Sequence, residues 1–199
     1  MKQFGIVLLG LQLFFCTVSE AQENNAIYFE SGVQVSIPVH IMMYRSHRLA
    51  VGANFRIMKP ITEKTTIGIR ADYEYRFTKI NNLTIVPDST LAEQARYRNF
   101  IILSLKPNVQ FALQSNWFLG IETGVGYAIS DANKGIGLGF VSEFAGPQRF
   151  GLCSNIFIGK HFKVVNYKMN LTLYLSQYLA HGHAENALGL RFNYLFNKL

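Results

Sequence analysis

Hydrophobic and polar residues alternate one by one along most of the chain. In residues 66–77, "TIGIRADYEYRF", Ile, Ala, Tyr and Phe occupy one parity, whereas Gly, Arg, Asp and Glu occupy the other. Successive side chains of a β-strand point to opposite faces, so this pattern predicts a strand with one apolar face and one charged face. Whichever of the two faces points outward decides whether the sheet belongs to a soluble protein or to a membrane protein.

The same two-residue period predicts eight strands. Pro107 interrupts the fourth of them, and we expect it near a rim or at a β-bulge, because proline lacks the N–H that a strand ladder needs. The stretch "GIGLGF" at 135–140 leaves open a barrel of ten strands. The eight predicted strands cover approximately residues 26–38, 48–58, 64–78, 97–113, 117–129, 148–162, 168–179 and 187–197.

The connections between these strands alternate in length. Residues 39–47, 79–95, 130–147 and 180–186 are the longer or more polar connections, and residues 59–63, 114–116 and 163–167 are the shorter ones. Long loops at one end and short turns at the other are typical of up-and-down barrels. The sequence therefore predicts an all-β fold, an eight-stranded antiparallel up-and-down β-barrel.

The first 21 residues predict an export signal. Lys2 supplies a positive start, an apolar run extends from Phe4 to Phe15, and Ser19 and Ala21 are small residues at the positions that a signal peptidase reads. The run is shorter than the ~20 residues of a transmembrane helix, and no later apolar stretch reaches about 18 residues. We therefore expect a signal peptide over residues 1–21 and a barrel domain over residues 22–199.

The polar face of the predicted strands favours a position inside the barrel. It carries many glycines, which weaken a strand but fit the crowded interior of a small barrel. It also carries charges of both signs, which can pair across a lumen, and buried charges must be paired. We expect a lumen charge network made of Glu30, Arg56, Arg70, Asp72, Glu74, Arg76, Glu122 and Arg191.

The apolar face favours contact with lipid. It is almost free of charge along all eight predicted strands, and aromatic residues stand near the strand ends, as in the aromatic girdles of transmembrane barrels. We therefore predict a transmembrane barrel with its apolar face outward. The expected girdle residues are Phe77, Tyr97, Trp117, Tyr194 and Phe196.

Composition narrows the functional classes. The chain has 199 residues, of which 49% are hydrophobic, 14% aromatic and only 16% charged, a profile that suits strands better than surface helices. The formal charge is +7, but the basic residues are scattered singly, which argues against a nucleic-acid site. Cys153 is the one cysteine beyond the expected signal peptide, so no internal disulfide is possible and we expect it to serve packing.

With its export signal, eight amphipathic strands and final strand "ALGLRFNYLF", the chain resembles the OmpX/OmpA-type outer-membrane β-barrels. The resemblance covers essentially the whole chain after the signal and rests on pattern rather than on a sharp motif. It implies residence in the outer membrane, contact with outer-membrane lipid and recognition of the last strand by the barrel-assembly machinery. In that family the last strand ends in an aromatic residue, whereas here three residues follow Phe196.

Candidate chemistry is sparse. "HGHAEN" at 181–186 offers His181, His183 and Glu185, but no serine stands beside them at the His-x-Ser spacing of lipid A deacylases with this architecture, and Ser176 only precedes the pair. Two histidines make only half of a metal site. Asp72 and Glu74 each have arginine neighbours two residues away, which keeps carboxylates ionised and suits a structural role.

We therefore expect a non-enzymatic, monomeric outer-membrane barrel with a side-chain-filled lumen, no cofactor and no metal. Its role would be structural or adhesive, carried by the longer loops, through which we expect it to contact an extracellular partner. Two alternatives remain open. One is a soluble periplasmic barrel that binds an apolar ligand, as lipocalins do, and the other is a lipid-modifying enzyme that uses the loop at 181–185.

Overall fold

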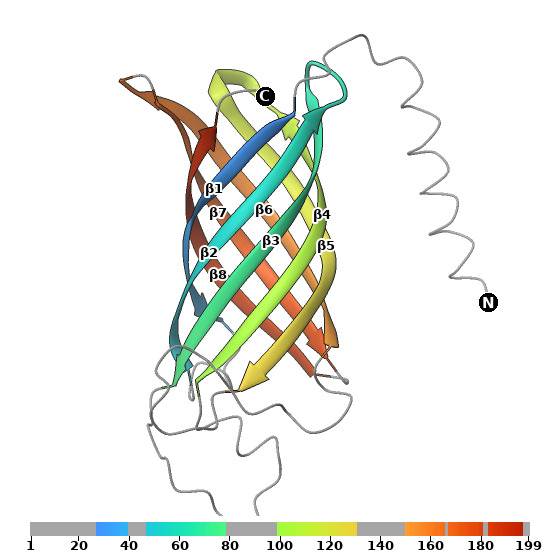
Figure 1. Ribbon diagram of the computed structural model, residues 1–199, viewed down its shortest axis with the longest axis vertical. Coiled ribbons are helices and arrows are strands. Elements are labelled where there is room, and N and C mark those ends of the chain that lie inside the picture. Colours follow the sequence, from blue (N-terminus) through green and yellow to red (C-terminus); the bar gives the residue numbers. More distant parts are fainter. Residues whose placement is uncertain are drawn as a thin grey trace, which may run out of the picture.

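The computed structural model describes residues 27–39, 47–78, 99–130, 150–165, 167–180 and 183–196, apart from some side chains at strand ends. The expected signal peptide at 1–21 and the stretch at 135–140 lie outside these ranges. Eight strands run through the described residues and surround one central space (Figure 1). They are β1 (Tyr28–Pro38), β2 (His47–Pro60), β3 (Thr65–Thr78), β4 (Phe100–Ala112), β5 (Trp117–Ser130), β6 (Phe150–Val164), β7 (Tyr167–Ala180) and β8 (His183–Phe196).

The strands form one closed antiparallel barrel. Each strand pairs with its neighbours in the sequence, and β1 pairs with β8 to complete the circle. Closure leaves no sheet edge with unpaired backbone groups. The predicted fold class, an eight-stranded antiparallel up-and-down barrel, is confirmed.

The two ends of the barrel differ. Residues 61–64, the 3₁₀ turn η2 (Gln114–Asn116) and residues 165–166 connect strands at one end, which is uppermost in Figure 1 and which we call the turn end. At the opposite end, the loop end, the strands lead into residues 40–46, 79–98, 131–149 and 181–182, which lie outside the description. Among the described residues, no helix is long and apolar enough to span a membrane.

Two predictions about the strands are wrong. The expected polar connection at 180–186 is mostly strand, because β7 and β8 stay paired as far as Ala180 and His183. Backbone pairing does not require apolar side chains, so polar residues at the rim did not end the strands. Pro107 lies within β4 and not at a rim or bulge: it is opposite Ile69, and the register with β5 is the same on both sides of it. The missing N–H interrupts the ladder locally without shifting it.

The apolar side chains point outward and the charged ones inward. Val33 is 63% exposed, Val125 59% and Ile156 66%, whereas Arg56 and Arg191 are each 1% exposed. Exposed large apolar side chains come from every strand. A water-soluble protein buries apolar side chains and exposes charged ones, so this barrel has the arrangement of a protein whose outer surface meets lipid.

Inward-pointing aromatic rings fill part of the space between the charges, and glycines make room for them. Tyr174 on β7 is directly opposite Gly189 on β8, and a Cβ added to Gly189 would clash with the Tyr174 ring. Phe157 on β6 is opposite Gly120 on β5 in the same way. The glycines of the polar face therefore serve close packing inside the barrel.

Candidate functional site: the charged lumen

The lumen holds a cluster of ionic side chains centred on Glu122 of β5. Its carboxylate lies 3.1 Å from Nε of Arg70, 2.8 Å from Nη2 of Arg191 and 3.3 Å from Nζ of Lys106. Asn155 also donates a hydrogen bond to it. Glu122 is 1% exposed, so these partners replace water around its negative charge.

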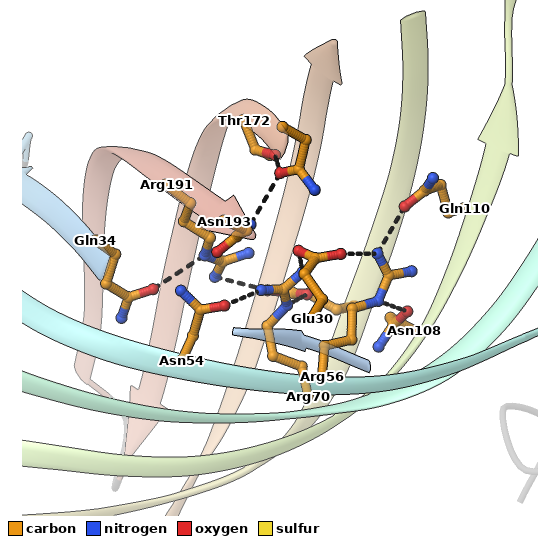
Figure 2. Close-up of polar contacts among 12 residues, drawn as sticks. Glu30, Gln34, Asn54, Arg56, Arg70, Asn108, Gln110, Thr172, Arg191 and Asn193 are labelled. Carbon is orange, nitrogen blue, oxygen red and sulfur yellow. Dashed lines mark hydrogen bonds and ion pairs between the residues drawn. The ribbon is translucent and has the colours of Figure 1, made fainter. Parts of the chain in front are cut away.

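A second carboxylate extends this cluster across the barrel (Figure 2). Glu30 of β1 lies 3.2 Å from Nη2 of Arg70 and 3.6 Å from Nη1 of Arg56. Arg70 therefore bridges Glu30 and Glu122, whose strands are far apart in the ring. Arg56 also donates to Oδ1 of Asn108 at 2.9 Å and to Oε1 of Gln110 at 2.6 Å.

Asp72 of β3 joins the cluster through Lys106 and Arg191. Its Oδ2 lies 2.6 Å from Nζ of Lys106, and its Oδ1 lies 3.9 Å from Nη2 of Arg191. Arg191 also donates from Nε to Oε1 of Gln34 at 3.0 Å, and its guanidinium carbon is 4.1 Å from the centre of the Tyr174 ring. Each charge thus has several partners, which a buried charge requires.

Glu74 and Arg76 lie in the same lumen, closer to the loop end. Nε of Arg76 donates to Oε1 of Glu74 at 2.7 Å, and the Ser36 hydroxyl donates to Oε2 at 3.3 Å. The structure thus places all eight predicted lumen residues inside the barrel. It joins six of them in one network, with Glu74 and Arg76 paired to each other.

Sequence reasoning missed Lys106 and the amides that complete the network. Lys106 is 4% exposed and contacts two carboxylates. Its parity within β4 is that of the polar face, although the sequence predicts a rim or bulge at Pro107 beside it. The amides have the same inward parity, which could have identified them: Gln34, Asn54, Asn108, Gln110, Asn155, Asn170 and Asn193.

The predicted aromatic girdle residues lie near both ends of the strands. Trp117 and Phe196 are 41% and 42% exposed at the turn end, where the Tyr194 and Phe196 rings meet edge to face at 4.8 Å. Phe77, near the loop end, meets Tyr75 at 4.9 Å. Tyr97 lies outside the described residues. Contact of these rings with a membrane interface stays a prediction.

The other candidate chemistry has little support in the lumen. Among the described residues, no group of three or more His, Cys, Asp and Glu side chains is placed to hold a metal ion. Ser176 donates to the Ala187 carbonyl at 3.3 Å. His181 lies outside the description, as do the side chains of His183 and Glu185. The buried thiol of Cys153 packs with Ile102, Ala128 and Tyr178.

The inward face of the described strands does not suit an apolar ligand. The cavity lined by Asp72, Lys106, Tyr174 and Arg191 has a volume of about 30 Å³. This is room for one water molecule and not for a lipid. Within the described strands, the lipocalin-like alternative therefore fails, because the inward positions carry charges and amides where that function requires an apolar wall.

Comparisons with known proteins agree with this architecture. No protein-family model and no curated protein matches the chain. Among solved structures, Ail, the attachment invasion locus protein of Yersinia pestis, is similar with a TM-score of 0.50 and 12% identity, over 86% of this chain and 98% of that one. The N-terminal β-barrel domain of OprF from Pseudomonas aeruginosa is similar with a TM-score of 0.50 and 11% identity, over 88% and 100%. The chain therefore has the eight-stranded barrel fold of OmpX/OmpA-type outer-membrane proteins.

Proposed function

We propose that the protein is an integral outer-membrane β-barrel without catalytic activity. The observation that carries this proposal is the reversal of burial, with an apolar exterior on every strand and a charged interior. In water, such an exterior would be an aggregation-prone surface. In a bilayer it replaces lipid–lipid contacts, and the closed barrel satisfies the backbone hydrogen bonds that lipid cannot satisfy.

The lumen network serves to hold the barrel closed and to fill its interior. Its ion pairs connect side chains from β1, β2, β3, β4, β5 and β8, so they cross-link strands that do not touch through their backbones. The small cavity and the density of paired charges support a barrel that passes neither ions nor solutes.

The longer connections at the loop end carry any interaction with an outside partner. In this proposal residues 1–21 direct export and are removed, the barrel-assembly machinery inserts the chain as a monomer, and the loop end faces the cell surface. One solved structure of the similar protein Ail contains the heparin analogue sucrose octasulfate. In this proposal a surface ligand of this chain binds at the loop end and leaves the lumen unchanged.

Membrane fractionation tests the proposal. We expect the protein in the outer-membrane fraction, resistant to extraction by carbonate, with faster gel mobility when unheated than when boiled. A soluble periplasmic protein whose mobility does not depend on heating would contradict it. In planar bilayers the inserted protein should give no stable conductance steps, and a porin measured in the same membrane provides the positive control. Steady unitary currents would contradict the closed lumen.

A further inference from the structure

Among the side chains that the structure describes, the exposed charges lie at the turn end. Among the charged side chains that the structure describes, those on the lumen side are buried. The exposed ones comprise a single carboxylate, Glu63, and five lysines. These lysines, which we call the lysine collar, are Lys59, Lys64, Lys160, Lys163 and Lys168.

The collar surrounds part of the turn-end rim. Lys59 and Lys64 flank or belong to the β2–β3 turn, and Lys163 and Lys168 flank the β6–β7 turn. Lys160 is directly opposite Trp117, the first residue after the turn η2. Because the lysines come from two separate turns of the rim, they suit several small anionic groups better than one compact acidic surface.

Within the described strands and turns, the collar lysines have no anionic partner, since no carboxylate there forms an ion pair with any of them. Lys163 is directly opposite Lys168 in the β6–β7 register, and like charges directly opposite each other destabilise an antiparallel pair. The fold therefore gathers positive charge that an outside anion would stabilise.

Aromatic side chains indicate the depth of the collar. Nζ of Lys160 lies 5.5 Å from the centre of the Trp117 ring. Tyr167 is 55% exposed, and its ring meets Tyr194 at 5.8 Å. Trp and Tyr favour the membrane–water interface, and lysine side chains lie along apolar surface while their ammonium groups reach the headgroups.

We propose that the lysine collar binds the anionic headgroups of lipids in the leaflet at the turn end. This inference rests on the membrane insertion proposed above. Bound headgroups would relieve the repulsion between Lys163 and Lys168 and, together with Trp117, would fix the depth of the barrel in the bilayer. A lysine near an anionic membrane surface contributes about fivefold to the affinity for that surface.

Trp117 allows a direct test, because it is the only tryptophan in the chain and lies beside Lys160. The folded full-length protein is reconstituted into phosphatidylcholine vesicles that contain a minor fraction of phosphatidylglycerol. In one preparation the phosphatidylglycerol is brominated, and in the other an equal mole fraction of the phosphatidylcholine is brominated. The brominated lipid quenches Trp117 on contact. We expect brominated phosphatidylglycerol to quench several-fold more effectively, and the preference to disappear in high salt because salt screens exposed charges.

Matched variants locate the preference. Replacing all five collar lysines together by glutamine should bring the ratio of the two quenching constants close to one, whereas arginine at the same positions should keep the preference. The variant Glu63→Gln in the same rim should keep or increase it. If the glutamine variant does not fold, the salt dependence of the unchanged protein still decides.

Each remaining outcome would overturn the inference in a different way. Equal quenching of the inserted protein by both brominated lipids would contradict the binding of anionic lipid by the collar, but not the membrane insertion of the barrel. No quenching by either lipid would mean that the barrel does not insert, and would contradict the proposed function as well. In neutral detergent, a Trp117 response to millimolar inorganic phosphate, combined with no lipid preference in vesicles, would assign the lysines to free anions.

Discussion

Arg191 of β8 and Glu122 of β5 come from strands that are not neighbours in the barrel, yet Nη2 of Arg191 lies 2.8 Å from Oε1 of Glu122. Neither side chain is more than 1% exposed. The pair therefore crosses the lumen away from water and connects walls that the backbone ladder joins only through intermediate strands.

Glu122→Gln should destabilise the barrel strongly. The change keeps the size of the side chain but leaves Arg70, Lys106 and Arg191 with less negative charge beside them. Removing one partner from a buried ionic group costs about 3–5 kcal/mol. Urea unfolding of the protein in lipid vesicles, followed by Trp117 fluorescence and by heat-dependent gel mobility, measures this free energy.

The control is Glu63→Gln, which removes an exposed carboxylate at the turn end. A surface change of this kind should alter the free energy of unfolding by no more than about 0.5 kcal/mol. Similar effects of the two variants would mean that Glu122 is not held by its buried partners.

Lys106 and Asp72 should depend on each other energetically. Their Nζ–Oδ2 distance is 2.6 Å in a buried setting, so Lys106→Met and Asp72→Asn should each destabilise the protein. The double variant should lose less than the sum of the two, with an interaction free energy of about 0.5–3 kcal/mol. Additive losses in a double-mutant cycle of unfolding experiments would show that the contact contributes nothing.

Gly189→Ala should destabilise the barrel, because the added Cβ would clash with the Tyr174 ring. Overpacking of this kind costs about 1–3 kcal/mol. When Tyr174 is replaced by leucine, the additional loss of stability caused by Gly189→Ala should be smaller than in the protein that keeps the tyrosine. Equal losses with and without the tyrosine would locate the cost in the backbone of β8.

Val125→Arg should oppose membrane insertion. Val125 lies within β5, is 59% exposed and points to the apolar exterior. An arginine on a lipid face costs about 2–4 kcal/mol near the bilayer midplane, so unfolding in vesicles should occur at a lower urea concentration. Val125→Leu is the control and should behave like the unchanged protein. An arginine variant that folds equally well in vesicles would place this face in water.

Cys153 should be protected from thiol reagents in the folded barrel. It is 6% exposed and packs among side chains of the lumen, so a bulky maleimide should label it only after unfolding. In this experiment Cys16 is replaced by serine. The comparison variant carries Gln114→Cys, in the exposed turn η2, with Cys153→Ser, and should react at once. Rapid labelling of folded Cys153 would indicate an open lumen.

Much of the architecture follows from the sequence, because the two-residue period is a local property of the chain. Arg70, Asp72 and Glu122 share the polar parity of their strands, and this parity alone assigns them to one face. The same period predicted eight strands in an antiparallel meander, and the short connections predicted the turn end.

Contacts between strands could not be derived in that way. Parity does not show which residue of β8 reaches Glu122, since that depends on the register of all the strands between them. The sequence did not predict the inward position of Lys106 beside Pro107, because this depends on the pairing of β4 with β3. It also did not predict the pairing of β7 with β8 as far as Ala180 and His183, which depends on the backbones of the two strands.

The sequence by itself determined the division of the chain into one apolar and one charged face, since alternation along a strand needs no partner. Only the tertiary structure decided how the faces are used. Closure of the barrel brings Glu30, Glu122 and Arg70 within bonding distance inside, and leaves Val33 and Ile156 exposed outside. Buried charges are stable only when paired, and pairing depends on distances that exist after the eight strands have closed.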